Sequence, residues 1–478
     1  MKSNQPTIWK NSVFVLFSLV IRLVTNYIVF VFIAWSYGIK ALGEFSLAFT
    51  VANLSLVLAD FGFDVLLTTE IANNIAKSKD IIKKYFSMKI IFVGIGLIVM
   101  IIVPTVQNYS RNSSILIYTL AIYVVLTSFS NFLFAIFRGY EKFEYETKIS
   151  FTTNTILLAF LVLFGIIMKS SLFVIMLIFI FAKTIGLLLS VKKTFSLLGH
   201  NIFKVHFDNW RTTIKKVLVF GLHYLFGNLF FKIDTLILGS LVGDSSVGLY
   251  QSAFKIMLLL LLFPEILRSS VLPVASRLFD RDQENWETIN KLTSKILLLI
   301  ALPITVTLFF FSEPIITLVY GSKYIEAVPI LRVFSIILLI RFYVEPYGLM
   351  ITTAHNQHIR MVIMIIATII AYFLNYYLIP LYGVIGAAYA SLAVNFLVGI
   401  SYIAVNLKYF LKWILDLRTN IILLMAIILF VLQIFINMND LFLICSILFL
   451  LGFTIIFGLS RVEKKVISRL VFKNTEAA

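Results

Sequence analysis

The segment YGIKALGEFSLAFT, residues 37–50, separates two long apolar runs and has a counterpart further along the chain. At an offset of 205 residues it aligns with VGDSSVGLYQSAFK, residues 242–255. The aligned pairs are Gly38 with Gly243, Gly43 with Gly248, Phe45 with Tyr250, Ala48 with Ala253, and Phe49 with Phe254. Because a match at a fixed offset indicates an internal repeat, it predicts two similar halves. Six apolar segments separate the copies. If each segment crosses a membrane once, both copies begin on the same side of it, and the repeat is parallel.

The composition places the chain in a membrane. Of its 478 residues 60% are hydrophobic and 13% are charged, and the mean hydropathy is +1.00. Soluble domains are about 45–50% apolar and about 25% charged. The apolar residues come in blocks of about 20, the length that a helix needs to cross a bilayer. We therefore predict an all-α integral membrane protein with about fourteen spans. The predicted spans are 12–37, 41–66, 85–107, 113–137, 149–168, 172–191, 217–241, 247–276, 296–319, 327–353, 361–380, 383–405, 421–436 and 441–459.

The repeat and the longest connection predict how these spans are grouped. Residues 1–193 form an N-lobe of spans one to six, and residues 194–216 form a basic cytoplasmic linker. Residues 217–406 form a C-lobe of spans seven to twelve. Residues 407–478 add spans thirteen and fourteen and a basic cytoplasmic tail. The expectation is two pseudo-symmetric six-helix lobes with two extra C-terminal helices.

The net charge of +17 is a topology signal rather than a sign of nucleic-acid binding. If the N-terminus is cytoplasmic, the cytoplasmic connections and both tails hold 28 of the 40 Lys and Arg residues. The opposite connections hold four, which are Lys40, Arg111, Lys169 and Lys323. This asymmetry is what the positive-inside rule requires. We predict a multi-pass protein with both termini in the cytoplasm and an uncleaved first span.

Several cations lie inside the predicted spans, where an ionisable group is costly and usually faces a cavity or a partner. From the helical rise of about 1.5 Å per residue, Arg22, Lys183 and Lys255 lie near the midplane. Arg268 and Arg341 lie in the cytoplasmic half, and Lys89 is expected to snorkel at the interface. Basic groups in a central cavity suit an anionic substrate, phosphate in particular. The candidate substrate-binding residues are Arg22, Asn26, Lys183, Lys255, Arg268 and Arg341.

Few carboxylates accompany these cations. Two spacings favour ion pairs within one helix, Glu265 with Arg268 and Arg341 with Glu345. Asp60, Asp234 and Glu265 are the candidates for ion or proton coupling, although pairing at a helix end would also account for Asp60 and Glu265.

Sequence signatures of enzymes and of tightly bound cofactors are absent. The chain has no GxxxxGK[ST] phosphate loop and no HExxH motif. Its single cysteine, Cys445, excludes an internal disulfide and a cysteine-based metal cluster. We expect no cofactor and no metal, with transport coupled to protons, sodium or the membrane potential.

Three segments resemble the bacterial polysaccharide flippases, the Wzx-type branch of the superfamily that also holds the multidrug (MATE) exporters and the lipid II flippase. The segments are FKIDTLILGSLVGDSSVGLYQSAFKI (231–256), EPIITLVYGSKYIEAVPILRVFS (313–335) and NYYLIPLYGVIGAAYAS (375–391). The residues that match the family patterns are Asp234, Gly248, Tyr250, Ala253, Gly321, Tyr324, Ala327, Gly383, Gly386 and Ala387. The resemblance covers nearly the whole chain.

The resemblance implies a MATE-like bundle that works by alternating access in the bacterial cytoplasmic membrane. The implied cargo is an undecaprenyl-diphosphate-linked oligosaccharide, moved to the periplasmic leaflet for O-antigen or capsule synthesis. Related flippases use an Arg in the first span and basic residues in span eight, the spans that hold Arg22, Lys255 and Arg268 here. We expect a monomer, with membrane lipid around it and a polysaccharide polymerase and a chain-length regulator as candidate protein partners.

Three other functions stay open at this point. A cation-coupled drug exporter of the same fold would favour acidic and aromatic cavity groups over the cations found here. A membrane-embedded polysaccharide polymerase or transferase would normally need larger external loops. A flippase for another polyprenyl cargo, such as teichoic acid or lipid II, is hardly distinguishable by sequence.

Overall fold

The computed structural model describes residues 5–199, 203, 214, 221–222, 224–413, 416–436, 440–458 and 463. This described part is helical, without strands, as the apolar blocks predict. Most of the predicted linker at 194–216 and most of the tail beyond 458 lie outside it. The chain divides into two compact units, residues 1–251 and residues 252–478.

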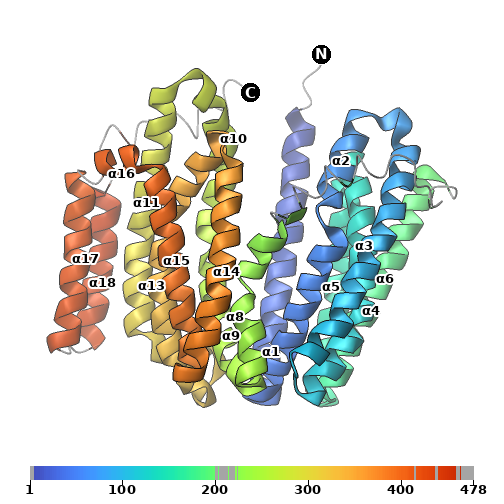
Figure 1. Cartoon of the computed structure of the whole chain (residues 1–478), viewed down its shortest axis with the longest axis horizontal. Coiled ribbons are helices and arrows are strands. Elements are labelled where there is room, and N and C mark those ends of the chain that lie inside the picture. Colours follow the sequence, from blue (N-terminus) through green and yellow to red (C-terminus); the bar gives the residue numbers. More distant parts are fainter. Residues whose placement is uncertain are drawn as a thin grey trace. The chain divides into compact units, whose positions relative to one another are not determined.

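The first unit is built around the long helix α1 (Gln5–Asp60). At Gly38 the backbone leaves the helical region, with φ of 82°, and the two arms of α1 run in opposite directions (Figure 1). The arms correspond to the first two predicted spans. The helices that follow are α2 (Phe63–Asn73), α3 (Ser78–Val106), α4 (Arg111–Gly139), α5 (Phe143–Phe160) with its π-helical extension Leu161–Ile167, α6 (Leu172–Leu198) and α8 (Ile233–Leu241).

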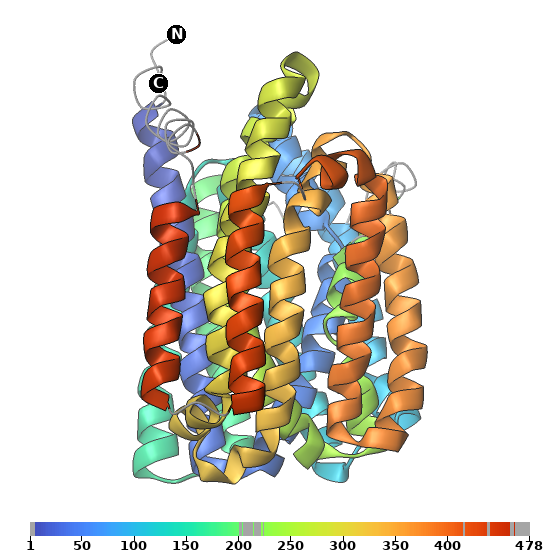
Figure 2. The same ribbon diagram turned by 90° about the vertical axis from the view of Figure 1, so that its left-hand side faces the viewer.

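The second unit begins within α9 (Asp244–Leu260). Its other helices are α10 (Leu262–Arg281), α11 (Gln283–Phe310), α12 (Ser312–Tyr320), α13 (Val328–Thr353), α14 (Gln357–Tyr382), α15 (Val384–Val405), α16 (Leu407–Trp413), α17 (Leu417–Ile436) and α18 (Asp440–Phe457). The hairpin of α10 and α11 extends past the ends of its neighbours, and α17 and α18 run side by side (Figure 2).

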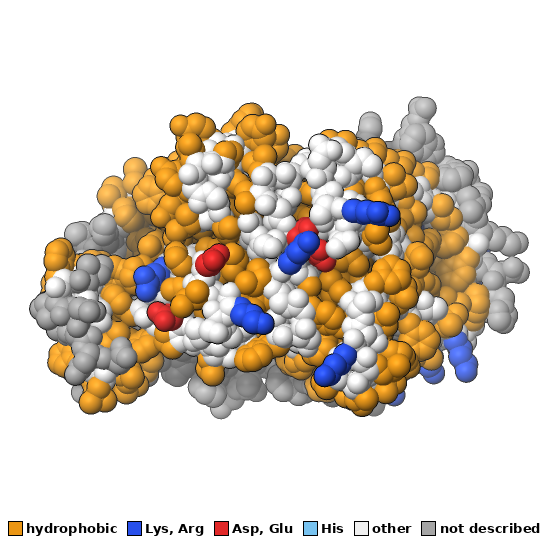
Figure 3. All heavy atoms as spheres, turned by 90° about the horizontal axis from the view of Figure 1, so that it is seen from below, with side chains coloured by type: hydrophobic (Ala, Val, Ile, Leu, Met, Phe, Trp, Pro, Cys, Tyr) orange, Lys and Arg blue, Asp and Glu red, His pale blue; other side chains and the backbone are white. Residues whose placement is uncertain are grey.

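The helices are long and apolar enough to cross a membrane. In the described part, ten helices have the length and apolar composition of a membrane span, and the number is twelve if two bent pairs are each counted as one span. Because one of the ten contains both arms of α1, and α18 is a shorter apolar helix, each of the fourteen predicted spans has a helix in the structure. Seen from the end at which α1 reverses, the surface carries a few scattered charges among hydrophobic side chains (Figure 3).

The predicted repeat is visible in the backbone. Gly38 and Gly243 both have positive φ, 82° and 101°, at the offset of 205 residues. The first residues of α3 and α11, Ser78 and Gln283, lie at the same offset. Positive φ costs an L-residue energy that glycine avoids, which explains why glycine occupies both reversals.

Equivalent glycines also lie at a close helix crossing in the first unit. A Cβ atom on Gly43 would lie 1.7 Å from the carbonyl oxygen of Asp244, and one on Gly248 would lie 2.1 Å from that of Ile39. The Ser113 hydroxyl donates to the Asp244 carboxylate at 2.6 Å beside this crossing. The second arm of α1 and the start of α9 therefore touch backbone to backbone.

Candidate functional site

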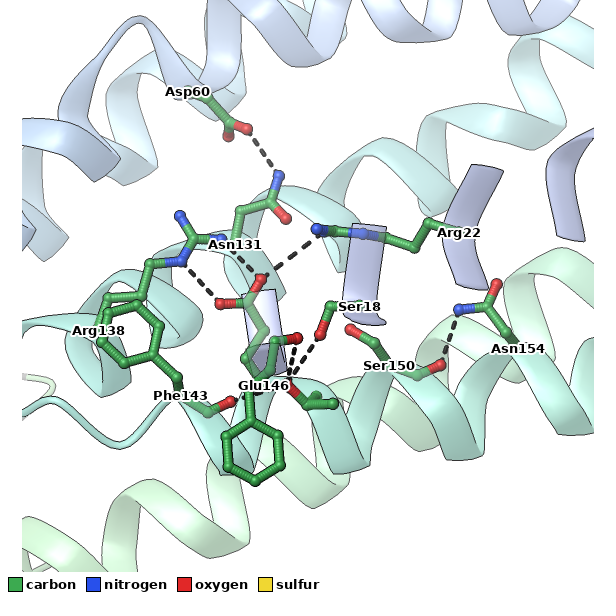
Figure 4. Close-up of polar contacts among 11 residues, drawn as sticks. Ser18, Arg22, Asp60, Asn131, Arg138, Phe143, Glu146, Ser150 and Asn154 are labelled. Atoms are coloured by element: carbon green, nitrogen blue, oxygen red, sulfur yellow. Dashed lines mark hydrogen bonds and ion pairs between the residues drawn. The ribbon is translucent and has the colours of Figure 1, made fainter. Parts of the chain in front are cut away.

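A buried glutamate organises the charged interior of the first unit. Glu146, in the first turn of α5, is 5% exposed. Arg138, in the last turn of α4, donates to both of its oxygens at 2.7 Å. Arg22 of α1 approaches the same carboxylate at 3.7 Å (Figure 4). Because a bidentate pair is the stronger geometry, Arg138 is the principal partner of Glu146 and Arg22 is held loosely.

The side chain of Arg22 stays 39% exposed despite its place in an apolar helix. Asn26, one helical turn further on, is also exposed. Next to Arg22, the Ser18 hydroxyl donates to Thr147 at 2.9 Å and so ties α1 to α5. Arg22 and Asn26 therefore present donors on an accessible surface of α1.

Lys183 of α6 belongs to the same region. Its ammonium lies 5.7 Å from the ring centre of Tyr123, a cation–π contact, and its charge repels that of Arg22. Within the described residues no carboxylate oxygen lies within 4 Å of it. Arg22 and Lys183, which the sequence placed near the midplane, are thus brought together.

Asp60, at the end of α1, has three side-chain partners on other helices. Lys89 of α3 contacts it at 2.5 Å, Ser128 donates to it at 2.7 Å, and Asn131 donates at 2.9 Å. The expectation that Lys89 snorkels at the interface is wrong, because Lys89 is 0% exposed and also lies 3.7 Å from Asp64. The position of Lys89 along the apolar run of α3 predicts how deep it lies in the membrane. It does not predict which way the side chain points.

Two carboxylates of the second unit, Glu265 and Glu345, are also paired. Arg268 binds Glu265 at 2.5 Å, which confirms the ion pair predicted from their spacing. Arg268 also reaches Glu345 at 3.4 Å, and Arg360 reaches Glu345 at 3.8 Å. Lys255 is partly buried on α9, and Arg341 lies on α13 one turn before Glu345.

Asp234 has a different environment. It is 4% exposed, and it accepts a hydrogen bond from the Tyr250 hydroxyl at 2.6 Å. Gln251 donates to Thr235 at 2.6 Å beside it. These bonds tie α8 to the start of α9, so two residues of the quoted family pattern, Asp234 and Tyr250, contact each other.

Sequence reasoning missed Glu146, Arg138, Asn131 and Arg360. Arg138 and Glu146 fall in the connection between two predicted spans, where charged residues are ordinary. The available signal was the pair of acidic residues at the start of α5, since acidic groups favour a helix N-terminus. That signal predicts a helix start and says nothing of a buried carboxylate.

The fold has close structural relatives. The lipid II flippase MurJ in an inward closed conformation matches with a TM-score of 0.69 and 17% identity over 96% of this chain and 98% of that one. An inward-facing multidrug resistance MATE family transporter matches with a TM-score of 0.66 and 15% identity over 82% and 95%. The fold is therefore the one that these two transporters share.

Sequence comparisons assign the chain to a family. The chain belongs to the polysaccharide biosynthesis protein family, whose model matches residues 8–279, and the MatE model matches residues 220–377. A probable low-salt glycan biosynthesis flippase, Agl15 of Haloferax volcanii, is 23% identical over 79% of this chain and 80% of its own length. The teichuronic acid biosynthesis protein TuaB of Bacillus subtilis is 29% identical, over only 24% of each chain.

Proposed function

We propose that this protein is a flippase for a polyprenyl-diphosphate-linked oligosaccharide used in surface polysaccharide synthesis. It moves its cargo from the cytoplasmic to the outer leaflet of the bacterial cytoplasmic membrane by alternating access, and both of its termini are cytoplasmic. Family membership, a flippase relative matched over most of its length and the fold of the MOP superfamily support this proposal.

The observation that carries the proposal is the contrast among the cations of the first unit. Arg138 and Lys89 are occupied by carboxylates at 2.7 and 2.5 Å. Arg22 lies 3.7 Å from its carboxylate and remains 39% exposed, and Lys183 has an aromatic neighbour instead. Guanidinium and ammonium groups with unused donors are suited to phosphate oxygens. Arg22 and Lys183 therefore form the proposed diphosphate contact, with Asn26 beside them.

Lys255, Arg268 and Arg341 are the proposed contacts from the second unit. Arg268 carries two carboxylate partners, so a diphosphate would have to compete with Glu265 and Glu345 for its donors. We expect its substitution to affect transport less than that of Arg22.

The membrane potential can drive this transport. A diphosphate carries about two negative charges, and each one moved outward across an inside-negative membrane releases about 2.3 kcal/mol per 100 mV. The return of the empty cationic site would oppose that gain unless its charge barely moves across the membrane or a counter-ion enters. Asp60, Asp234 and Glu265 are the proposed coupling carboxylates. Glu265, whose side chain is 57% exposed, is the most accessible of the three.

The test is complementation of a bacterium that lacks its own polysaccharide flippase, with surface glycan as the readout. We expect the wild type to restore glycan, Arg22→Gln and Lys183→Gln to lose most of it, and Arg22→Lys to retain part. Lys148→Gln, an exposed cation on α5, is the matched control. Membrane levels of each variant are measured by immunoblot.

Two results would each reject one part of the proposal, the first its binding site and the second its function. Normal glycan export by well-expressed Arg22→Gln and Lys183→Gln variants would exclude the cationic contact. Wild type that restores no glycan from any tested pathway, but confers drug resistance on the same host, would favour the exporter function of the MATE neighbours.

A further inference from the structure

A cavity of about 420 Å³ lies within the second unit, and none of the charged residues considered so far lines it. Helices α11, α13, α15, α16 and α17 line it, largely with apolar and aromatic side chains such as Tyr343, Phe396, Ile400, Trp413 and Leu423. The cavity is open on one side, because two of these side chains, Phe396 and Ile400, are 56% and 49% exposed. An occupant would supply the dispersion contacts that the lining lacks on that side. An apolar cavity is a binding place for an apolar molecule. In a bilayer the abundant apolar molecule is a lipid chain.

The cavity lies where the α17–α18 pair joins the rest of the second unit. The pair packs mainly on α11, where Leu298 and Leu302 meet Ile422 and Ala426. The cavity takes up the space between α17 and the helices α13 and α15. An occupant of this space would complete the packing of α17 on the side that α11 does not cover.

One end of the cavity is polar. Lys295 is 4% exposed and is held by Asp416 and Glu463, each at 3.0 Å. Lys291 is different, since its side chain is 38% exposed and its nitrogen lies 4.0 Å from Asp416. Lys291 therefore retains donors for a phosphate at the mouth of the cavity.

Helix α16 indicates where this polar end lies in the membrane. It is bent by 79° from α17 and exposes Leu407 and Leu411 together with Lys408 and Lys412. Exposed leucines beside lysines are typical of a helix that lies in the headgroup region. Glu287 of α11 fixes α16, through Lys412 at 2.6 Å and the Trp413 indole at 3.5 Å. The polar end is thus at headgroup level and the apolar part extends into the hydrocarbon.

We propose that this cavity binds one glycerophospholipid of the surrounding membrane. An acyl chain fills the apolar part, and the lipid phosphate contacts Lys291. The lipid serves as a packing element that holds α17 and α18 against the second unit. This inference does not depend on the transported cargo, which has to leave the protein after each cycle.

The test is native mass spectrometry of the full-length protein purified in mild detergent. We expect the wild type to retain one phospholipid. Ile400→Trp fills the cavity and should lose it, whereas Leu397→Trp, on the same helix but outside the lining, should keep it. Lys291→Gln should bind roughly tenfold more weakly because a charge-assisted contact is lost, and Lys408→Gln should not change.

A second measurement keeps the proposal testable if the Ile400→Trp variant does not fold. Delipidated wild type is titrated with phosphatidylethanolamine, phosphatidylglycerol or a polyprenyl phosphate while its melting temperature is followed. We expect the two phospholipids to raise it, and to raise it less in Lys291→Gln. The proposal is overturned if no phospholipid is retained, if only the polyprenyl phosphate stabilises the protein, or if Ile400→Trp and Leu397→Trp retain lipid equally.

Discussion

Individual charged residues of the first unit divide into those that hold the fold and those that are accessible to a ligand. Arg138 and Lys89 are engaged by carboxylates at short distances, whereas Arg22 and Lys183 are not. The sequence could find Arg22 and Lys183 because a cation stands out in an apolar run. It could not separate Lys89 from them, because depth along a helix does not reveal a partner on another helix.

The Asp60–Lys89 pair should respond strongly to removal of one partner. Asp60→Asn leaves a fully buried ammonium with only Asp64 at 3.7 Å, and we expect a loss of about 3 kcal/mol of stability. The double variant Asp60→Asn/Lys89→Met should recover most of it. Thermal unfolding in detergent measures both, and equal stability of the single and double variants would contradict the pairing.

Arg138 and Arg22 should separate folding from transport. Arg138→Gln leaves buried Glu146 without its bidentate partner, so we expect a lower melting temperature and less protein in the membrane. Arg22→Gln removes a loose, partly exposed contact worth about 0–1 kcal/mol, so we expect near-normal stability with lost glycan export. The same effect of both variants on the melting temperature would refute this division of roles.

At the scale of the helices, the crossing of α1 and α9 at Gly43 is set by backbone contact rather than by side-chain chemistry. Gly43 tolerates no side chain, because its Cβ would lie 1.7 Å from a carbonyl oxygen. Gly38 has open space around it, so a side chain there meets only the strain of φ 82°.

These two glycines should therefore differ in their sensitivity to substitution. We expect Gly43→Ala to cost about 3 kcal/mol or more and Gly38→Ala about 1–2 kcal/mol. Gly94→Ala, inside α3 with nothing near its Cβ, is the control and should be neutral or slightly stabilising. Melting temperatures rank the three variants, and a Gly38 variant less stable than the Gly43 variant would overturn the argument.

The start of α11 gives a prediction about pH. Asp282 caps this helix, and hydrogen bonds from the backbone and side chain of Asn285 lower the pKa of Asp282 from its usual 3.8. A lowered pKa stabilises the fold above pH 3.8 and ceases to do so as the pH falls through the folded value. Asp282→Ala should therefore melt earlier than wild type at pH 7, and the difference between them should shrink as the pH is lowered below 3.8.

For the whole molecule, charge asymmetry predicts which side of the membrane each connection faces. In a Cys445→Ser background, single cysteines replacing exposed Lys40 or Lys323 should react with an impermeant maleimide on intact cells. Cysteines replacing exposed Lys142 or Lys408 should react only after lysis. Labelling in the opposite pattern would mean that the N-terminus is outside.

The whole-molecule fold was more accessible from the sequence than the site. Apolar runs and repeated glycines depend on local chemistry, so the spans, the reversal at Gly38 and the repeat could be predicted. The pairing of Glu146 with Arg138 depends on the packing of α4 against α5. Spacing along one chain segment does not reveal this, and both residues looked like ordinary connection residues.

The contact between Gly43 and Gly248 bears on how an internal repeat of this kind could arise. Equivalent positions in contact are what a two-fold homodimer of a half-length ancestor would form around its symmetry axis. Gene duplication and fusion would convert that subunit interface into an internal crossing. In such a homodimer, one substitution of this glycine would place a side chain in both subunits, so the crossing would suffer two clashes. In the fused chain a substitution of either glycine would clash only once, at its own side of the crossing.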